Sequence, residues 1–270
     1  MNRAWLWLTI PIALLGAVAS SVGILVDSTY ERDVKSFAVQ AVSQDYVTLF
    51  VAVPAILLLC RLAYRGSFSA RLMWHGVVFY FAYTYTIAAF MVRFNDLFLV
   101  YTSLLACSIF ALVGGVGSLG WPLKSSMFGA SWPRRSVVGF LIVIVVTFLA
   151  LWLSDIVPAI VNGVEPESLA ESATPTNGIQ VLDLSLLLPG SALTAYWVWK
   201  LEVRGYVFAT GLVAYAALLS LALVAMIIGL TRADLAADAA VSVIFVVVAG
   251  AASTILFAIV RSIQKTAIET

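Results

Sequence analysis

The sequence predicts an all-α protein, a polytopic bundle of eight membrane-spanning helices. Of its 270 residues, 63% are hydrophobic and only 11% are charged, whereas a soluble domain has about 45–50% apolar and about 25% charged residues. Eight stretches also lack Asp, Glu, Lys and Arg over most of the roughly 20 residues that cross a hydrocarbon core about 30 Å thick. A formal charge of +1 offers no basic surface to a nucleic acid, so we expect the lipid bilayer as the main partner.

The predicted spans follow one another in a single integral membrane domain. The second and the sixth are short, but Arg61 and Lys200 extend them because long basic side chains reach the headgroups. The charge-free runs are residues 4–26, 46–60, 72–92, 97–123, 136–154, 184–199, 205–231 and 239–260.

The first run begins like a secretory signal peptide. A basic start, an apolar stretch and the small triplet Ala17-Val18-Ala19 are features that a signal peptidase accepts. The apolar run nevertheless continues to Val26, which makes a full span. We therefore expect a retained first helix.

The connection before the second span contains an amphipathic pattern. Its apolar positions are Val34, Phe37, Ala38, Ala41 and Val42. This spacing predicts a short helix that lies on the outer membrane surface or over the bundle.

Prolines interrupt several of the runs, and Pro54 and Pro189 lie inside the second and sixth predicted helices. A proline removes one helix hydrogen bond and frees a carbonyl group, which in transporters helps to form a site at a broken helix. The alternative is a simple kink, because proline is common in membrane helices.

The third span is the most aromatic and carries a polar face. At about 100° per residue, this face covers an arc of about 140° that should turn away from lipid; it holds His75, Gly76, Tyr80, Tyr83 and Thr86. The hydroxyl groups either line a pocket or bond to neighbouring helices. Since His75 is the single histidine, we expect no zinc or haem site and no cofactor.

Two motif matches near the inner face are better explained by packing. Gly115, Gly117 and Gly120 fit G-x-G-x-x-G, but they end an apolar helix instead of opening one, so small residues for close helix contact are expected. Ser118 and His75 form a conceivable dyad, although no third group supports an enzyme. Cys60 and Cys107 fall within spans and are expected to be small buried residues.

The distribution of Lys and Arg predicts that both termini are cytoplasmic. With this orientation, eleven of these basic residues lie on the inner side of the membrane and four on the outer side. The inner residues are Arg3, Arg61, Arg65, Arg71, Lys124, Arg134, Arg135, Lys200, Arg204, Arg261 and Lys265, and the outer ones are Arg32, Lys35, Arg93 and Arg232. Tryptophans agree, since Trp5, Trp7, Trp74, Trp121, Trp132, Trp197 and Trp199 fall at inner boundaries and Trp152 at an outer one.

A weak internal match suggests duplication. Residues 47–54 align without a gap on residues 182–189, and both segments run on to an Arg-Gly pair. The match is consistent with two parallel four-helix halves, residues 1–130 and 131–270, or with chance similarity between apolar helices.

No charged residue falls near the middle of a predicted span, which argues against a proton pump or an intramembrane aspartyl protease. Acidic residues instead gather at outer helix ends: Asp27, Asp45, Asp96, Asp155, Asp183, Asp234 and Asp238. The candidate ligand-binding residues are Asp45, Arg93, Asp96, Asp155 and Asp183, with Tyr80 and Tyr83 from the aromatic span. Alternatively, topology leaves the acids outside, and Asp45 and Asp183 cap helix starts.

Three short tracts resemble a family of bacterial multi-pass integral membrane proteins that has no assigned activity. They are Gln44-Asp45-Tyr46-Val47 leading to Pro54, the tract from Phe94 to Tyr101, and Thr176-Asn177-Gly178 followed by Val181-Leu182-Asp183-Leu184. The resemblance implies a bacterial cytoplasmic membrane. In such relatives we expect a histidine where this chain has Gln180, so this chain offers an amide and no imidazole at that position.

These observations leave three hypotheses of function. The first is transport or binding of a small solute or lipid through an outward-facing site without a mid-membrane charge. The second is a non-catalytic membrane subunit or assembly protein, whose polar faces contact a membrane protein partner. The third is a membrane-embedded enzyme at the outer face, with no catalytic residue or metal ligand identified. A central cavity containing Tyr80, Tyr83, Pro54 and Pro189 would favour the first.

Overall fold

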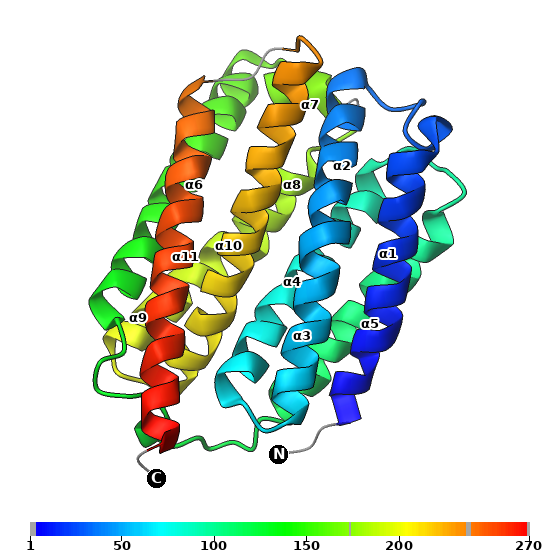
Figure 1. Cartoon of the computed structure of the whole chain (residues 1–270). Helices are drawn as coiled ribbons and strands as arrows, with labels where there is room; N and C mark the ends of the chain where they lie inside the picture. The colour runs from blue at the N-terminus through cyan, green and yellow to red at the C-terminus, as the bar shows by residue number, and fades with distance from the viewer. Residues whose placement is uncertain (1–3, 173, 236–238, 269–270) are drawn as a thin grey trace.

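The computed structural model describes residues 4–172, 174–235 and 239–268, and within them it contains helices and no strands. The long helices run side by side as a bundle (Figure 1). The start of the first helix and the last turn of the final helix lie at the same end of this bundle (Figure 1). The fold class is therefore the all-α bundle that the sequence predicts.

Each predicted span corresponds to one long helix or to one stack of helical segments. In chain order these are η1 with α1 (Ala4–Leu8, Thr9–Leu25), α2 with η3 and α3 (Lys35–Val47, Thr48–Ala52, Val53–Tyr64), α4 (Phe68–Met91), α5 (Phe98–Gly117), α6 (Arg134–Asn162), α8 with η5 and α9 (Gly178–Leu182, Asp183–Leu187, Leu188–Trp199), α10 (Val203–Arg232) and α11 (Ala239–Ile268). The short elements between them are η2 (Asp27–Thr29), η4 (Ser125–Met127) and α7 (Glu167–Ser172).

Seven of these helices in the described part of the chain are long and apolar enough to cross a membrane. The eighth, α4, has 24 residues but carries the aromatic and polar face predicted above. It is buried on most sides and packs against α3, α5 and α10. Because neighbouring helices separate α4 from lipid, it needs less hydropathy than they do.

The prediction of a short helix on the outer membrane surface or over the bundle is wrong. Helical structure does begin after Val34, but α2 continues without a break through η3 into α3 and forms one helix of 30 residues. It stands upright beside α1 and α10 (Figure 1). The charge of Asp45 interrupted the apolar run, so the outer third of this helix was separated from the span to which it belongs.

The helices that contain Pro54 and Pro189 each have a π-helical segment just before the proline. The segments are η3 and η5, and Pro54 and Pro189 each sit within the first two residues of the α-helix that follows. An extra residue in the turn relieves the clash between a proline ring and the carbonyl group four residues earlier. Both prolines are exposed on the bundle surface, so they do not line a central cavity as the first hypothesis expected.

The same features recur at a constant interval of 135 residues. The pairs are Thr48–Ala52 and Asp183–Leu187, Pro54 and Pro189, the left-handed residues Gly66 and Leu201, and Gly76 and Gly211. Gly76 and Gly211 meet where α4 crosses α10, since a Cβ atom at Gly76 would overlap the carbonyl oxygen of Gly211. The interval is what duplication predicts, and the division into halves 1–130 and 131–270 stays a prediction.

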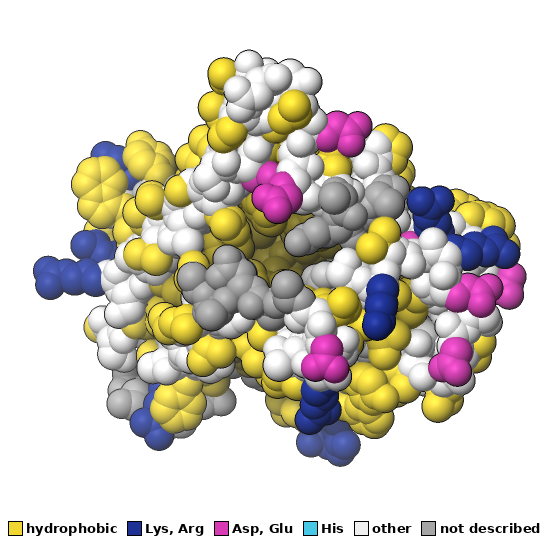
Figure 2. Space-filling view, turned by 90° about the horizontal axis from the view of Figure 1, so that it is seen from above, with side chains coloured by type: hydrophobic (Ala, Val, Ile, Leu, Met, Phe, Trp, Pro, Cys, Tyr) yellow, Lys and Arg dark blue, Asp and Glu magenta, His cyan; other side chains and the backbone are white. Residues whose placement is uncertain are grey.

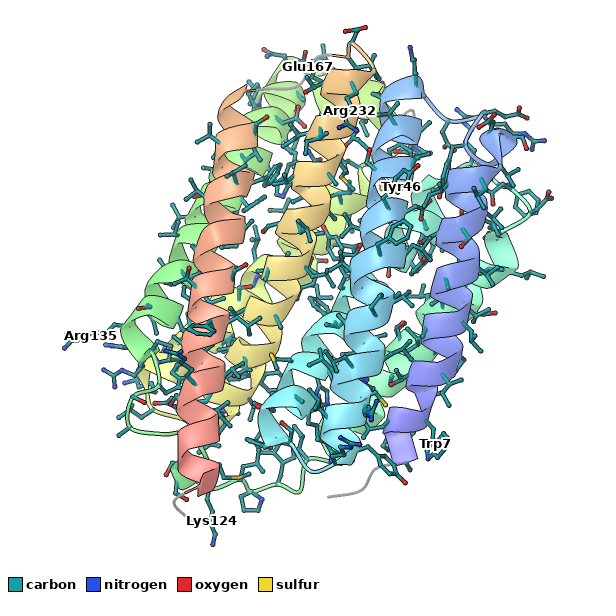
Figure 3. The ribbon with its side chains drawn as sticks, in the orientation of Figure 1. Trp7, Tyr46, Lys124, Arg135, Glu167 and Arg232 are labelled. Atoms are coloured by element: carbon teal, nitrogen blue, oxygen red, sulfur yellow. The ribbon has the colours of Figure 1, made fainter. Side chains whose placement is uncertain are left out.

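Charged and aromatic markers lie at opposite ends of the bundle. Trp7, Lys124 and Arg135 lie at the end where the described chain begins and ends, and Glu167 and Arg232 lie at the other (Figure 3). We call the latter the acidic end. Arg3 and Asp238, which the sequence analysis assigned to the two faces, lie outside the described residues, as does the side chain of Lys265.

Candidate functional site

Two carboxylates are buried inside membrane helices near the acidic end. Asp45 is 7% exposed and Asp183 is 4% exposed. Asp45 lies about 15 Å along the axis from the start of α2, and Asp183 about 7.5 Å from the start of α8, at about 1.5 Å per residue. Both carboxylates thus lie in the parts of their helices nearer the acidic end, and the alternative that both residues cap helix starts is wrong. Val34 precedes α2 without a side-chain cap, and Asn177 caps α8.

Asp45 is held by a tyrosine from the preceding connection. The Tyr30 hydroxyl donates to Asp45 Oδ2 at 2.7 Å. Burial, and then the charge of Asp45, raise the pKa of Tyr30 well above its ordinary value, so the phenol keeps the proton that it donates. Gly23 of α1 touches this pair, because a Cβ atom there would overlap the Asp45 carboxylate.

Asp183 is held by two donors from other helices. The Tyr83 hydroxyl of α4 donates to Asp183 Oδ1 at 2.8 Å, and Trp152 Nε1 of α6 donates to Asp183 Oδ2 at 2.9 Å. Among the described residues no basic side chain forms an ion pair with this carboxylate. A buried carboxylate without a cation costs several kcal/mol of desolvation, and hydrogen bonds to a charged group recover about 1.5–3 kcal/mol each.

The inward face of α4 mostly connects helices. Tyr80 Oη shares a hydrogen bond with Thr48 Oγ1 at 2.9 Å, and Gln44 Nε2 donates to Thr84 Oγ1 at 2.8 Å. Tyr80 is completely buried within the hydrophobic core of the first half. Tyr80 and Tyr83 are thus close together on α4, but only Tyr83 contacts a predicted acidic residue.

A cavity of about 60 Å³ lies beside Asp183, between α6, η5, α9, α10 and α11. Its walls are mainly apolar and include Phe148 and Phe245, whose rings stack at 6.1 Å. Tyr215 of α10 also lines it, and the buried Tyr215 hydroxyl has Tyr83 as its polar neighbour, although the two do not meet in good hydrogen-bond geometry. One water-sized group occupies about 10–15 Å³ of such space, so the cavity has room for several small groups next to a carboxylate and a tyrosine.

The acidic end of the molecule is also hollowed in the space-filling view. Figure 2 looks onto this end and shows a central hollow whose walls carry hydrophobic side chains, with acidic and basic side chains mostly around the rim. The apolar interior therefore continues close to this surface.

Asp155 belongs to a separate polar cluster at the acidic end. Its Oδ2 atom accepts from Ser168 Oγ at 2.6 Å and from Gln180 Nε2 at 2.8 Å. Gln180 is 6% exposed and also donates to Ser168 at 3.2 Å. This arrangement ties α6, α7 and α8 together, and Gln180 uses its amide where we expected a histidine in relatives.

Arg93 and Asp96 do not join either carboxylate. Both side chains are exposed in the connection between α4 and α5, and they form no ion pair within the described residues. The backbone N–H of Arg93 donates to Asp33 Oδ1 at 3.0 Å. Burial raises the pKa of Asp33, and the bond from Arg93 opposes this shift. The five charged residues that the sequence offers as candidate ligand-binding residues are thus distributed over separate places.

Near the opposite end, the conceivable Ser118–His75 dyad is not formed. Ser118 Oγ donates to the Gly115 carbonyl at 2.8 Å and accepts from Arg71 Nη2 at 2.6 Å. His75 Nδ1 lies 2.7 Å from the Arg71 carbonyl oxygen. Gly115 packs directly on the His75 ring, as the small-residue interpretation of the glycine motif predicts. Among the described residues no three His, Cys, Asp or Glu side chains are placed to hold a metal ion.

Sequence reasoning missed Tyr30, Trp152 and Tyr215. Tyr30 and Trp152 were available as hydrogen-bond donors near predicted outer ends, but nothing in their spacing indicates which acid they reach. Tyr215 had one weak signal, since it lies 135 residues after Tyr80. No family model, curated protein or solved structure matches the chain, so the site is assigned from its own chemistry.

Proposed function

We propose that the protein binds an amphiphile in the cavity beside Asp183, as a binding or transport protein of the membrane. The observation that carries this proposal is that the Asp183 carboxylate and Tyr215 border one otherwise apolar cavity. Ionisable residues inside membrane helices commonly mark functional sites because burying them is costly.

The chemistry of the walls indicates the class of ligand. A carboxylate only accepts hydrogen bonds, so the polar part of the ligand should donate them or carry a positive charge. The surrounding Leu, Ile and Phe side chains suit a short apolar chain. A protonated alkylamine has both properties.

The equivalent residues in the first half of the chain are closely packed, which is why we place the ligand in the second half. Thr48 and Tyr80 correspond by the 135-residue interval to Asp183 and Tyr215, and they satisfy each other across a packed core. In the second half, the corresponding residues Asp183 and Tyr215 border the cavity instead of bonding to each other. Beside the cavity, α6 and α11 are in limited contact. The first hypothesis expected a central cavity around Tyr80 and Pro54; we now propose the site beside Asp183 in its place.

We place the protein in the bacterial cytoplasmic membrane, with both termini in the cytoplasm and the acidic end outside. The excess of Lys and Arg at one end supports this orientation. Asp183 then lies near the outer face, within reach of molecules from the outer leaflet.

Calorimetry with butylammonium as the probe tests the proposal, because a short chain suits a cavity of about 60 Å³. We expect saturable binding to the purified protein in a neutral detergent, with butanol and butanoate at least tenfold weaker. Asp183→Asn should weaken butylammonium binding at least tenfold, because it removes a charge-assisted hydrogen bond of about 1.5–3 kcal/mol. Tyr215→Phe should weaken it less, and Tyr80→Phe is the matched control that should leave it unchanged.

The variants separate loss of binding from loss of fold. Tyr215→Phe removes a hydroxyl whose polar neighbour is Tyr83, whereas Asp183→Asn changes the acceptor of two hydrogen bonds. The thermal midpoint should therefore fall less in Tyr215→Phe than in Asp183→Asn. Equal affinity of the wild type, Asp183→Asn and Tyr215→Phe would exclude this cavity as the site.

A further inference from the structure

The Asp183 carboxylate lacks a positive charge more than it lacks hydrogen bonds. Tyr83 donates to one of its oxygen atoms and Trp152 donates to the other. In the part of the chain that the structure describes, no basic side chain forms an ion pair with it. A ligand that completes this site therefore has to bring a positive charge, but it does not have to bring an N–H donor.

Aromatic rings form part of the wall of the same cavity. Phe148 of α6, Phe245 of α11 and Tyr215 of α10 all line it. Phe148 lies four residues before Trp152 on the same face of α6, and Trp152 is the residue that reaches the carboxylate from this helix. The Phe148 ring also stacks on the Phe245 ring at 6.1 Å between centroids. Rings from three helices thus border the space beside one negative charge.

The walls offer few acceptors to a primary ammonium group, which has three N–H donors. Besides Asp183 and Tyr215, the polar side chains among the described residues that line the cavity are Ser191 and Ser220. The Ser220 hydroxyl is already bonded within α10, where it donates to the Ala216 carbonyl at 2.6 Å. An N–H group that is buried without an acceptor costs free energy. Methyl groups on the nitrogen avoid this cost, and the cation is still attracted to the ring faces.

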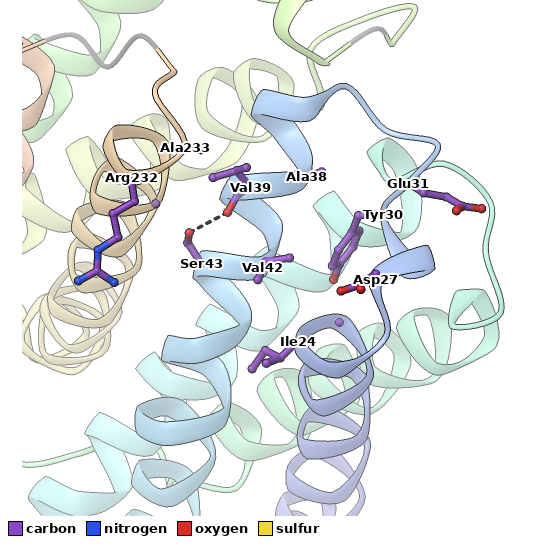
Figure 4. Close-up of a pocket in the computed structure, with 12 residues that line it drawn as sticks. Ile24, Asp27, Tyr30, Glu31, Ala38, Val39, Val42, Ser43, Arg232 and Ala233 are labelled. Atoms are coloured by element: carbon purple, nitrogen blue, oxygen red, sulfur yellow. Dashed lines mark hydrogen bonds between the residues drawn. The ribbon is translucent and has the colours of Figure 1, made fainter.

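The larger recess at the acidic end does not combine these features. It has a volume of about 460 Å³ and lies between the end of α1, the first turns of α2 and the end of α10. Figure 4 shows its acids, Asp27 and Glu31, on one side of α2 and Arg232 on the other. Both acids are exposed, and the hydroxyl of Tyr30, which also lines the recess, is bonded to Asp45. Water therefore reaches these acids, and rings do not enclose them.

On the basis of the function proposed above, we infer that the cavity beside Asp183 prefers a quaternary ammonium group to a primary one. The trimethylammonium group of choline places its positive charge beside the carboxylate, and its methyl groups contact the rings of Phe148, Phe245 and Tyr215. This group occurs both in free solutes and in the headgroup of phosphatidylcholine, and the cavity recognises the chemistry that the two share.

Calorimetry with the purified protein in a neutral detergent tests this preference. The probes are ethanolamine, its mono-, di- and trimethylated forms, of which the last is choline, and the neutral alcohol in which carbon replaces the nitrogen atom of choline. We expect the affinity to rise with methylation and to fall at least tenfold when the charge is removed. Phe148→Leu and Phe245→Leu keep the wall apolar, and each should reduce the preference for choline over the neutral alcohol at least threefold.

Control variants separate the cavity from other rings and acids. Phe110 lies 135 residues before Phe245 on the exposed surface of α5 and does not line the cavity, so Phe110→Leu is the matched control for Phe245→Leu. Asp27→Asn removes an acid of the larger recess. Both variants should bind choline like the wild type.

Ethanolamine that binds at least as tightly as choline would overturn the inference, and so would Phe148→Leu and Phe245→Leu variants that keep the wild-type preference. In either case, butylammonium binding that depends on Asp183 would leave the proposed function standing. If no amine binds more tightly than its neutral counterpart, the proposed function fails as well.

Nanodiscs distinguish the two sources of the trimethylammonium group. The affinity for choline is compared between nanodiscs whose zwitterionic lipid is phosphatidylcholine and nanodiscs whose zwitterionic lipid is phosphatidylethanolamine. An affinity at least threefold lower with phosphatidylcholine shows that the lipid headgroup competes for the cavity. Equal affinity in the two kinds of nanodisc assigns the cavity to a free solute.

Discussion

Asp45 and Asp183 are buried carboxylates that each rely on a tyrosine hydroxyl from elsewhere in the chain. Tyr30 supplies the donor to Asp45, and Tyr83 supplies one donor to Asp183. The difference lies in what surrounds them, since Asp45 is pressed against Gly23, whereas Asp183 borders a cavity. Asp45 therefore belongs to the packing of α1 and α2, and Asp183 is the better candidate for a ligand.

The contact at Gly23 yields a stability prediction. Gly23→Ala places a methyl group against the Asp45 carboxylate and the Tyr30 hydroxyl, so it should destabilise the protein by about 1–3 kcal/mol, as overpacking does. Gly139→Ala is the matched control, because a Cβ atom there meets nothing within 4 Å. Thermal unfolding in detergent measures both; a Gly23→Ala midpoint equal to that of Gly139→Ala contradicts the packing role.

At the scale of elements, α4 and α10 form the centre of the molecule. They cross at Gly76 and Gly211, and each then packs against its own set of neighbours. The contact is not symmetric, since a Cβ atom at Gly76 overlaps backbone of α10, whereas one at Gly211 has its nearest contact at 3.7 Å. Only one of the two glycines is required by sterics.

This asymmetry predicts opposite outcomes for the same substitution. Gly76→Ala should separate the two central helices and lower stability by about 1–3 kcal/mol or prevent folding. Gly211→Ala should be neutral or slightly stabilising, because alanine favours a helix by up to about 1 kcal/mol over glycine. Size-exclusion profiles and thermal midpoints of the two variants, compared side by side, check this order; the reverse order would show that the crossing is misplaced.

The sequence predicted the elements better than the site, for identifiable physical reasons. Charge-free runs mark spans because lipid excludes unpaired charge, but the same rule divided the helix at Asp45, where Tyr30 makes burial tolerable. The periodicity of α4 correctly predicted that Tyr80 and Tyr83 face inward. It could not predict that Asp183 accepts from Trp152, or that Tyr215 borders the same cavity, because these depend on how α6 and α10 each pack against α9.

At the scale of the whole molecule, the bundle has two chemically different ends. The end that carries Glu167 and Arg232 holds both buried carboxylates and the cavity beside Asp183, and the other end carries Lys124 and Arg135 (Figure 3). An excess of basic residues at one end of a membrane protein indicates its cytoplasmic side. In the proposed orientation, the cavity faces the outside or the outer leaflet.

Cysteine labelling in intact cells tests this orientation. In a background with Cys60→Ala and Cys107→Ala, we expect Glu167→Cys to react with a membrane-impermeant maleimide before lysis, because Glu167 is exposed at the acidic end. Lys124→Cys and Arg135→Cys are exposed at the opposite end, so they should react only after the cells are opened. Labelling of Lys124→Cys in intact cells, with Glu167→Cys protected, would reverse the topology. The cavity beside Asp183 would then face the cytoplasm, and its ligand would have to come from that side of the membrane.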